Sequence, residues 1–357
     1  MCKTLILLFW LALAATAAAA QNDFSESKPY RPRELQLTPE EQKKLDRKKS
    51  KEDRKTASEP TVDLVETIRI PVFVEDSKGV PLRELRQSDF KVFVDGAERE
   101  IKSFEKGKTA RRFLLVVDSS PSIAFEKKTL RGAALAMIGA LRPDDLMRLA
   151  KFDLNLYFLT EMTGDRPLLE KKAGKLRADE GTAIYDSIRK ISREYLRAET
   201  EPPIVLLLTD GIDTISEKAD YASSLAALEK TGAVVFPFYF DSYDFITKNR
   251  AASGSKNGPG SLQGNYVGTT EQESRLGRTY LQDVADLSGG IVYTINDFEK
   301  VETKDFDGVF ERLEPQYYLA IEQRVTSRRN ERRQLTVRVA RPNLKVRARG
   351  SFVTGED

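Results

Sequence analysis

The feature that most constrains the fold is an unbroken apolar run that ends abruptly in polar residues. In RRFLLVVD, residues 111–118, five apolar residues lead to Asp118, and two serines, a proline and a third serine follow. A run this apolar predicts a strand buried on both faces, which is typical of a parallel sheet. The pattern recurs in PIVLLLTDG, residues 203–211, where Asp210 follows the apolar run.

Between residues 111 and 313, apolar runs of this kind alternate with helical patterns. The expected strands are FLLVVD, LMRLAKFD, NLYFLT, IVLLLTD, AVVFPFYF and IVYTIN. Helical patterns fall between them, near 127–141, around Leu168, Leu169 and Leu176, and near 183–196 and 219–228. This alternation predicts an α/β domain with a doubly wound, mostly parallel, Rossmann-like sheet. The tight join at Leu154, between the second and third strands, predicts one antiparallel edge.

The regions on either side, residues 61–108 and 315–354, alternate apolar and polar residues, as half-exposed β-strands do. Asp95-Gly96 marks a hairpin in the first region. A lone hairpin is only marginally stable in water, so we expect both regions to build one β-sandwich into which the α/β domain is inserted. Two independent β elements are the alternative. Ten lysines and arginines between Arg324 and Arg349 are interpreted as a solvated sheet face.

The N-terminus predicts export. Residues 1–20 combine Lys3, an apolar stretch and the small residues Ala18 to Ala20, which is the pattern of a cleaved signal peptide. The alternative is an uncleaved anchor, although residues 4–20 would span only about 25 Å as a helix. Residues 21–60 are charged and without apolar periodicity, so we expect a disordered tether. Its basic cluster, residues 43–55, offers an alternative reading as a weak contact with an anionic surface.

Export to the cell envelope, the periplasm or the medium excludes nucleic acid as a partner, and we expect no transmembrane helix in the mature chain. The only cysteine, Cys2, lies in the signal peptide, and the chain has no histidine. The mature protein therefore has no disulfides, and catalysis by histidine or the usual zinc and copper sites are excluded.

In open α/β sheets, ligands bind beyond the carboxyl ends of the strands. Asp118 and Asp210 end two apolar strands, Ser120 and Ser122 follow the first, and Thr182 begins a helix that can reach the same edge. Taken singly, these are common turn and capping residues. Together they predict a metal site with oxygen ligands alone. Two carboxylates and three hydroxyls fit Mg²⁺, with Mn²⁺ or Ca²⁺ as alternatives.

These residues carry a family resemblance. The D-x-S-x-S spacing of residues 118–122, the distant Thr182 and TDG match the metal-ion-dependent adhesion site of von Willebrand factor type A (VWFA) domains. The resemblance covers roughly residues 111–313, and GTAIYDSI and TDGIDTIS resemble a secreted bacterial subgroup. It implies that Ser120, Ser122 and Thr182 bind the metal through hydroxyls. Asp118 and Asp210 would act mainly through coordinated water, and an Asp or Glu of a protein or surface ligand would take the remaining position.

Three functions are weighed. The first is a metal-dependent adhesion or binding module without enzymatic activity. The second is a Mg²⁺-dependent phosphohydrolase with Asp118 as nucleophile, which lacks a nearby acid–base carboxylate because Ser120 stands there. The third is a structural or assembly protein with a stabilising metal.

Three further features bear on the site. Residues 244–272 form a Gly/Ser-rich insertion that we expect to emerge beside the metal. Asp186 is interpreted as part of a helix start. Asp213 is interpreted as an exposed turn residue or a support of the metal ligands.

Overall fold

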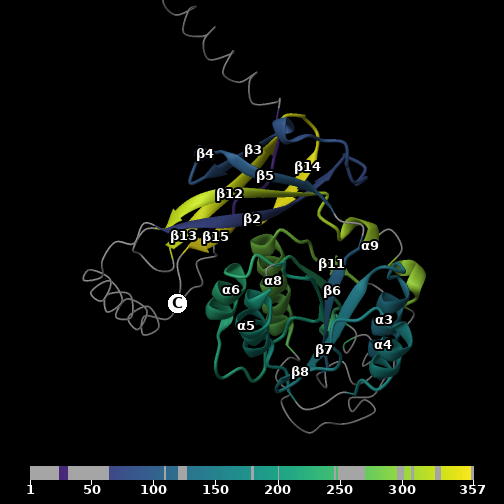
Figure 1. The fold of residues 1–357 in the computed structure, drawn as a ribbon. Coiled ribbons are helices and arrows are strands. Elements are labelled where there is room, and N and C mark those ends of the chain that lie inside the picture. Colours follow the sequence, from purple (N-terminus) through teal and green to yellow (C-terminus); the bar gives the residue numbers. More distant parts are fainter. Residues whose placement is uncertain are drawn as a thin grey trace, which may run out of the picture.

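The computed structural model describes residues 24–30, 64–107, 110–119, 127–177, 181–199, 201–244, 247, 270–295, 301–306, 309–325 and 331–354. Within them, a six-stranded sheet with helices on both faces lies below two smaller antiparallel sheets (Figure 1). The predicted signal peptide, most of the tether, Ser120, Ser122 and nearly all of the Gly/Ser-rich insertion lie outside these residues. No helix among the described residues is both long and apolar enough to span a membrane.

The six-stranded sheet has the predicted doubly wound form. Its strand order is β11-β10-β9-β6-β7-β8, and only the last pair is antiparallel, as the tight join at Leu154 predicts. The strands are β6 (Arg112–Asp118), β7 (Leu146–Phe152), β8 (Leu156–Phe158), β9 (Ile204–Thr209), β10 (Val235–Tyr239) and β11 (Tyr293–Thr294). Every residue of β9 and β10 is buried, because helices cover both faces.

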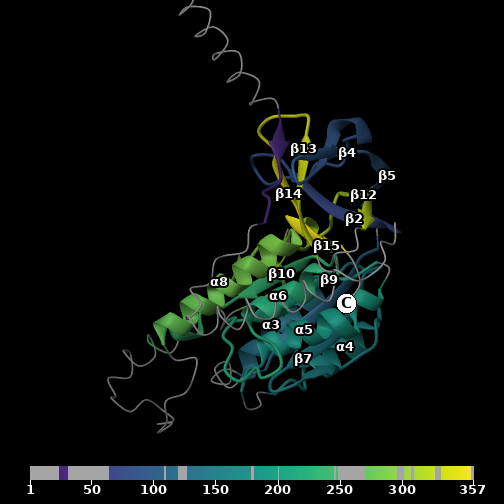
Figure 2. The same cartoon turned by 90° about the vertical axis from the view of Figure 1, so that its left-hand side faces the viewer.

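Two sets of helices cover the sheet (Figures 1 and 2). On one face lie α3 (Lys127–Gly139), α4 (Arg166–Ala173) and α9 (Val309–Arg312), whose core includes Leu130, Leu169 and Phe310. On the other face lie α5 (Ile184–Glu194), α6 (Tyr221–Glu229) and α8 (Glu271–Ser288), whose core includes Ile188, Leu225 and Leu281.

The longest of these helices, α8, was not among the predicted ones. Its start carries a capping box, in which the Thr270 side chain accepts from the Glu273 amide and the Glu273 side chain bonds back to the Thr270 amide. Gly289 ends it in the left-handed conformation, with φ of 85°. Both signals are present in the sequence, but the adjoining Gly/Ser-rich run concealed them. The insertion therefore ends at Thr270 rather than at Gln272.

Strands from both flanks build one β-sandwich, as predicted. One sheet has the order β14-β2-β12-β5; the other has β1-β13-β3-β4, with β15 also paired to β13. Their bounds are β1 (Ser25–Glu26), β2 (Leu64–Glu75), β3 (Phe90–Val94), β4 (Ala97–Arg99), β5 (Ile101–Lys106), β12 (Tyr317–Val325), β13 (Glu331–Val339), β14 (Lys345–Ala348) and β15 (Ser351–Thr354). The alternative of two independent β elements is thereby wrong, because β12 pairs with both β2 and β5.

Local turn chemistry in the sandwich follows the sequence. Asp95 and Gly96 both have positive φ, 50° and 80°, which is the geometry of a two-residue hairpin between β3 and β4. Between them, the two sheets bury a core that includes Ile70, Phe90 and Leu335.

The tether prediction is wrong for residues 24–30. Ser25–Glu26 pairs with β13, the Ser27 amide donates to the Val337 carbonyl at 2.8 Å, and Tyr30 is buried. Ser27 and Val337 are 310 positions apart in the sequence, so no local pattern predicts this contact. An isolated two-residue strand has no periodicity to read.

The interpretation of the C-terminal arginines as a solvated face is only partly right. Arg338 and Arg341 form exposed ion pairs with Glu26 and Glu84. Arg349, by contrast, is buried and donates to the Glu229 carbonyl, at the end of α6. Some of these arginines therefore fasten the sandwich to the α/β domain.

Candidate metal site

The site residues that the structure describes lie at the carboxyl ends of the central parallel strands. We call this region the carboxyl edge and define it by Asp118, Asp153, Thr182, Asp210 and Ser242. The amino ends of β6 and β9 meet the sandwich, as the cavity between them shows, so the carboxyl edge faces away from the sandwich (Figure 1).

Asp118 is the last residue of β6 and is fully buried. Parallel pairing places Val117 opposite Leu208 of β9, and Asp118 next to Thr209. The Thr209 hydroxyl donates to Oδ2 of Asp118 at 2.6 Å. The following residue, Ser119, is held to β7 because its amide and its hydroxyl both donate to the Phe152 carbonyl, at 2.8 and 2.9 Å. Ser119 thus continues the pairing of β6 with β7 by one residue.

Asp210 follows β9 directly and is 1% exposed. Its Oδ1 accepts from the Ile212 amide at 3.0 Å, and its Oδ2 accepts from the Ser242 hydroxyl at 2.7 Å. Ser242 follows β10, the next strand of the sheet, so a third strand end contributes to the same cluster. A hydroxyl that donates to a carboxylate stabilises its charged form.

Thr182 reaches this edge from the loop before α5 and is 2% exposed. Its amide donates to the Thr214 hydroxyl at 2.8 Å, and its carbonyl accepts from the Thr214 amide at 2.8 Å. The neighbouring Ala183 amide donates to the carbonyl of Asp153, which follows β7, also at 2.8 Å. Thr182 is thus fixed to the loops that follow both β9 and β7.

A close glycine contact holds α8 against Asp210. Gly211 has φ of 78°, and a Cβ on Gly277 of α8 would lie 2.8 Å from the Gly211 carbonyl carbon and 2.9 Å from the Asp210 carbonyl oxygen. No larger residue fits at position 277 without moving the helix. The insertion that precedes α8 begins just after Ser242, so its first described residues lie at the carboxyl edge, as expected.

Asp186 and Asp213 hold the loops around the site through hydrogen bonds. Asp186 accepts from the amides of Lys218 and Ala219, which fixes the loop before α6 to α5. Asp213 accepts from the Tyr185 amide at 3.2 Å and from the Ser216 hydroxyl at 2.6 Å. It is half-buried, so the reading of an exposed turn residue is wrong. Burial raises the pKa of Asp213, against hydrogen bonds that lower it.

The structure thus places Asp118, Thr182 and Asp210 at the same edge of the sheet, whereas Ser120 and Ser122 lie outside the described residues. Sequence reasoning missed Thr209 and Ser242. Both were detectable, because Thr209 stands in the TDG motif and Ser242 follows an apolar strand at the same edge. Among the described residues, no three acidic, histidine or cysteine side chains gather as a metal cluster. A site with two carboxylates and several hydroxyls does not require one.

The donor set fits a hard divalent cation. Asp118, Thr182 and Asp210 offer oxygen atoms only, which is the ligand chemistry that Mg²⁺, Mn²⁺ and Ca²⁺ share. Burying a carboxylate is costly unless its charge is offset or well hydrogen-bonded. Asp118 and Asp210 are both almost fully buried, and a cation beside them would offset the cost of burying their charge.

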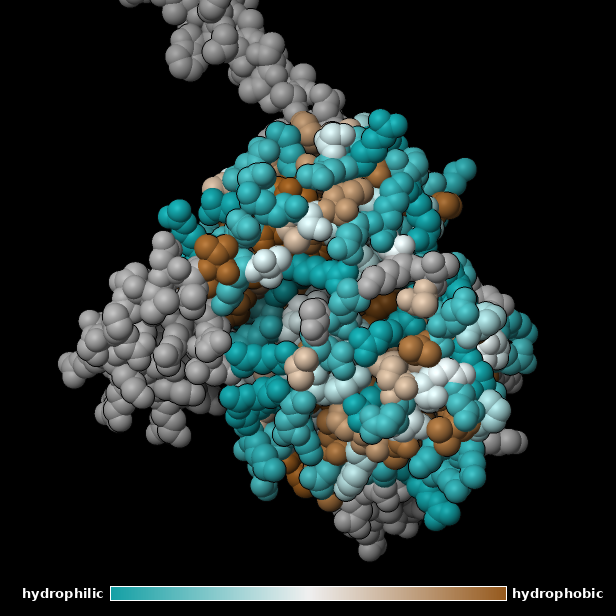
Figure 3. All heavy atoms as spheres, in the orientation of Figure 1, coloured by the Kyte–Doolittle hydropathy of each residue, from teal (hydrophilic) through white to brown (hydrophobic). Residues whose placement is uncertain are grey.

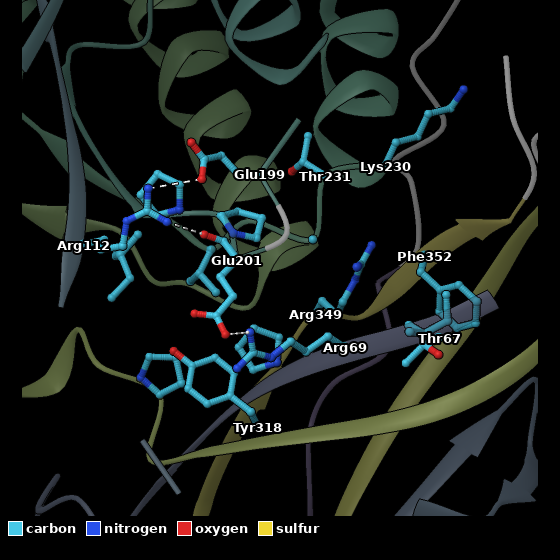
Figure 4. A pocket seen from close by; sticks show the side chains of 18 of the residues that line it. Thr67, Arg69, Arg112, Glu199, Glu201, Lys230, Thr231, Tyr318, Arg349 and Phe352 are labelled. Carbon is cyan, nitrogen blue, oxygen red and sulfur yellow. Dashed lines mark hydrogen bonds and ion pairs between the residues drawn. The ribbon is translucent and has the colours of Figure 1, made fainter. Parts of the chain in front are cut away.

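A cavity of about 410 Å³ lies at the opposite end of the sheet, between the sandwich and the amino ends of β6 and β9. Four of its charged side chains pair with one another (Figure 4). Arg112 pairs with Glu199 at 3.1 Å, and Arg69 pairs with Glu201 at 2.9 Å while lying over the Tyr318 ring. The oxygen ligands predicted for a metal therefore lie at the carboxyl edge rather than in this larger cavity.

No family model matches the sequence, and no curated protein does. Among solved structures, the chain is similar to BatB from Bacteroides thetaiotaomicron, with 14% identity, a TM-score of 0.41 and coverage of 57% of this chain and 98% of that one. A von Willebrand factor type A structure from Catenulispora acidiphila gives 11% identity and a TM-score of 0.41, over 84% and 74%.

A mussel byssus protein, proximal thread matrix protein 1 with a zinc-occupied MIDAS motif, gives 16% identity and a TM-score of 0.40, over 60% of this chain and 50% of that one. At these TM-scores and identities the similarities carry no functional argument. The fold that the sequence predicted is confirmed by the strand order and pairing of the sheet itself.

Proposed function

We propose that the chain is an exported VWFA-like binding module. In this proposal a divalent cation, Mg²⁺ in the first instance, is held at the carboxyl edge and captures a carboxylate of a protein or surface ligand. Thr182, with Ser120 and Ser122, would bind the cation through hydroxyls, and Asp118 and Asp210 would act mainly through coordinated water. The protein would work outside the cytoplasm, in the periplasm, at the cell envelope or after secretion.

The observation that carries this proposal is the convergence of three residues far apart in the sequence. Asp118 ends β6, Asp210 follows β9 and Thr182 lies in the loop before α5, and all three are buried at one edge of one sheet. Because Asp118 and Asp210 would act through coordinated water, the protein ligands in direct contact with the ion would be neutral hydroxyls, and an incoming Asp or Glu would bring a directly bound negative charge. Binding is favoured over catalysis because Ser120 stands where a phosphohydrolase that uses Asp118 would need an acid–base carboxylate.

The proposal is tested with a fluorescein-labelled peptide rich in Asp and Glu, titrated with the protein in Mg²⁺ and in EDTA. We expect binding in Mg²⁺ alone, and its loss in Asp118→Asn. The matched control is Asp144→Asn, which makes the same chemical change at an exposed position beside β7 and should bind like the wild type. Equal binding by Asp118→Asn and wild type would refute the proposal.

The same samples separate the other two functions. Mg²⁺-dependent hydrolysis of p-nitrophenyl phosphate, abolished by Asp118→Asn, would establish the phosphohydrolase. A rise in melting temperature with Mg²⁺ but no binding of any acidic ligand would establish the stabilising metal of an assembly protein. The proposal predicts neither result.

A further inference from the structure

A groove of about 270 Å³ lies along α5, between that helix and the turn from β7 to β8. Four basic side chains line it and outnumber the two carboxylates there. The basic residues are Arg189, Lys190, Arg193 and Lys218, and the acidic ones are Asp186 and Glu194. The groove therefore attracts anions.

One of the two carboxylates is already engaged by the protein. Asp186 accepts from the backbone amides of Lys218 and Ala219, which fixes one wall of the groove. The Arg189 guanidinium closes the same wall by donating to the Lys218 carbonyl at 2.6 Å. The basic side chains are thus mounted on a helix and on a loop that is bonded to it, which favours a defined binding surface.

An apolar surface separates this groove from Thr182. Leu154 and Ile215 are 41% and 44% exposed. Gly181, which directly precedes Thr182 and has φ of 72°, lies between them. A Cβ there would stand 2.6 Å from Cδ2 of Leu154 and 2.9 Å from Cγ2 of Ile215. We call Leu154 and Ile215 the apolar shelf. Figure 3 shows apolar groups exposed among hydrophilic ones on this part of the molecule, over β7 and β8.

The shelf and the groove are continuous, because Leu154 belongs to both. Outward from the candidate metal, the surface presents a cation site, then two aliphatic side chains, then a basic channel. A peptide that matches this surface carries a carboxylate, then an aliphatic side chain, then more carboxylates. Apolar contact supplies affinity in such an interface, and charge complementarity supplies selectivity and association rate.

We infer that the partner is a protein segment in which an acidic residue is followed by an aliphatic residue and a short acidic run. The first carboxylate binds at the metal, the aliphatic side chain lies on Leu154 and Ile215, and the acidic run lies along α5. This inference rests on the proposed function and gives it a partner class.

The test uses three labelled decapeptides that differ in one feature each. The first is Gly-Ser-Asp-Leu-Glu-Glu-Glu-Glu-Gly-Ser, the second replaces Leu with Ser, and the third replaces the four Glu with Gln. Anisotropy titrations in Mg²⁺ should show weaker binding of the second and third peptides by about fivefold to tenfold each. Only the third substitution should reduce the dependence of affinity on salt.

Variants locate the two contacts on the protein. The pair Lys190→Glu with Lys218→Glu should weaken binding of the first peptide about tenfold but leave the third unaffected. The control pair Lys171→Glu with Lys175→Glu makes the same charge change at exposed positions at the end of α4, on the other face of the sheet, and should change affinity less than about twofold. Leu154→Ser should weaken the first peptide and not the second. Circular dichroism confirms that each variant is folded.

The outcomes distinguish this inference from the function on which it rests. If Asp118→Asn abolishes Mg²⁺-dependent binding while the groove and shelf variants bind like the control pair, the inference is overturned and the function stands. If the groove variants weaken binding but Asp118→Asn and EDTA do not, the function is wrong. Binding of phosphatidylglycerol vesicles through Lys190 and Lys218, without binding of the first peptide, would replace the peptide by an anionic surface.

Discussion

Asp153 at the carboxyl edge pairs with Lys151 at 2.9 Å, but the other buried carboxylates at the two ends of the α/β domain have different partners. At the end next to the sandwich, which we call the junction, they pair with arginines. Asp145 bonds Arg111, with both side chains buried, and Glu75 accepts from Arg312 and Arg347 at 2.8 and 2.9 Å. At the carboxyl edge, Asp118 and Asp210 accept from the hydroxyls of Thr209 and Ser242.

This difference indicates what each end of the domain is for. A guanidinium offsets the charge of its carboxylate from within the chain, and it fixes two elements to each other. A hydroxyl stabilises a carboxylate but leaves its charge in place. The junction thus holds the sandwich on the domain through ion pairs, whereas Asp118 and Asp210 at the carboxyl edge are oriented by hydroxyl groups. The two ends should therefore respond differently to substitution, to pH and to metal.

The largest effect on stability is expected at the junction. Asp145→Ala would leave the Arg111 guanidinium buried without its main partner, which costs about 3–5 kcal/mol of unfolding free energy. Urea titration monitored by circular dichroism measures this loss. In contrast, Glu26→Ala, which breaks the exposed pair with Arg338, should cost less than about 1 kcal/mol. Equal losses in the two variants would mean that the junction pair is not structural.

The second effect separates the carboxyl edge from the junction by metal. Mg²⁺ at about one hundred times its dissociation constant should add about 2.7 kcal/mol to the stability of the wild type. Asp118→Asn should lose this gain while remaining folded in EDTA, because the amide oxygen can still accept from Thr209. Glu26→Ala should keep the whole gain. Thermal unfolding with and without Mg²⁺ measures this gain in stability. A full gain in Asp118→Asn would contradict the claim that the carboxyl edge binds the ion.

A third effect concerns pH at the junction. Burial alone raises the pKa of Glu75, but the hydrogen bonds and charges of Arg312 and Arg347 outweigh it, so the pKa lies below its usual value of 4.5. A carboxyl group with a lowered folded pKa contributes stability that is fully present above its unfolded pKa and is lost as the pH falls through the folded value. Glu75→Gln should therefore cost about 1.5–3 kcal/mol at pH 7, and the difference from wild type should shrink below pH 4.5.

Glu314, in the same region, supplies the control for this pH effect. Burial raises the pKa of Glu314, against the opposing charge of Arg83. Its ionised form is therefore disfavoured by folding, and Glu314→Gln should not lower stability at pH 7. Urea titrations at pH 7 and pH 4 compare both variants with the wild type. The same sign of effect for both would show that the arginines around Glu75 do not set its behaviour.

The smallest effect tests how α8 supports the carboxyl edge. Gly277→Ala should cost about 1–3 kcal/mol, because the added methyl group meets the backbone of Asp210 and Gly211. It should also weaken the response to Mg²⁺. The control is Gly132→Ala in α3, where the added methyl group meets nothing within 4 Å and should stabilise the protein by up to about 1 kcal/mol. Equal changes in stability and in the response to Mg²⁺ in the two alanine variants would mean that α8 does not support the carboxyl edge.

Much of this arrangement could be predicted because it follows from local patterns. Fully apolar runs predict β6 and β9. Because parallel strands end at the same edge of a sheet, Asp118 and Asp210 are expected at one edge from the sequence alone. The Asp95-Gly96 turn and the antiparallel β8 were likewise readable from short stretches. Thr182 was expected at this edge because it begins a helix that can reach it, but nothing near it in the sequence reveals that Thr214 and Asp153 hold its loop in place.

The features that escaped prediction depend on distant partners. The strand Ser25–Glu26 exists only because β13 lies beside it, and the buried position of Arg349 follows from the approach of Glu229 at the end of α6. The sequence pattern of an arginine-rich strand is the same whether its guanidinium groups face water or a buried carboxylate. Ser242 escaped for a different reason: its position after β10 was visible, but a lone serine there has many ordinary explanations.

The most direct test of the account is the position of a metal ion in a crystal soaked with Mn²⁺. Anomalous scattering from manganese should give a single strong peak at the carboxyl edge, within about 2–2.5 Å of the Thr182 hydroxyl and close to Asp118 and Asp210. Crystals of Asp118→Asn should lack it. A peak only among other residues, or no peak at millimolar Mn²⁺, would contradict the claim that this edge binds a cation.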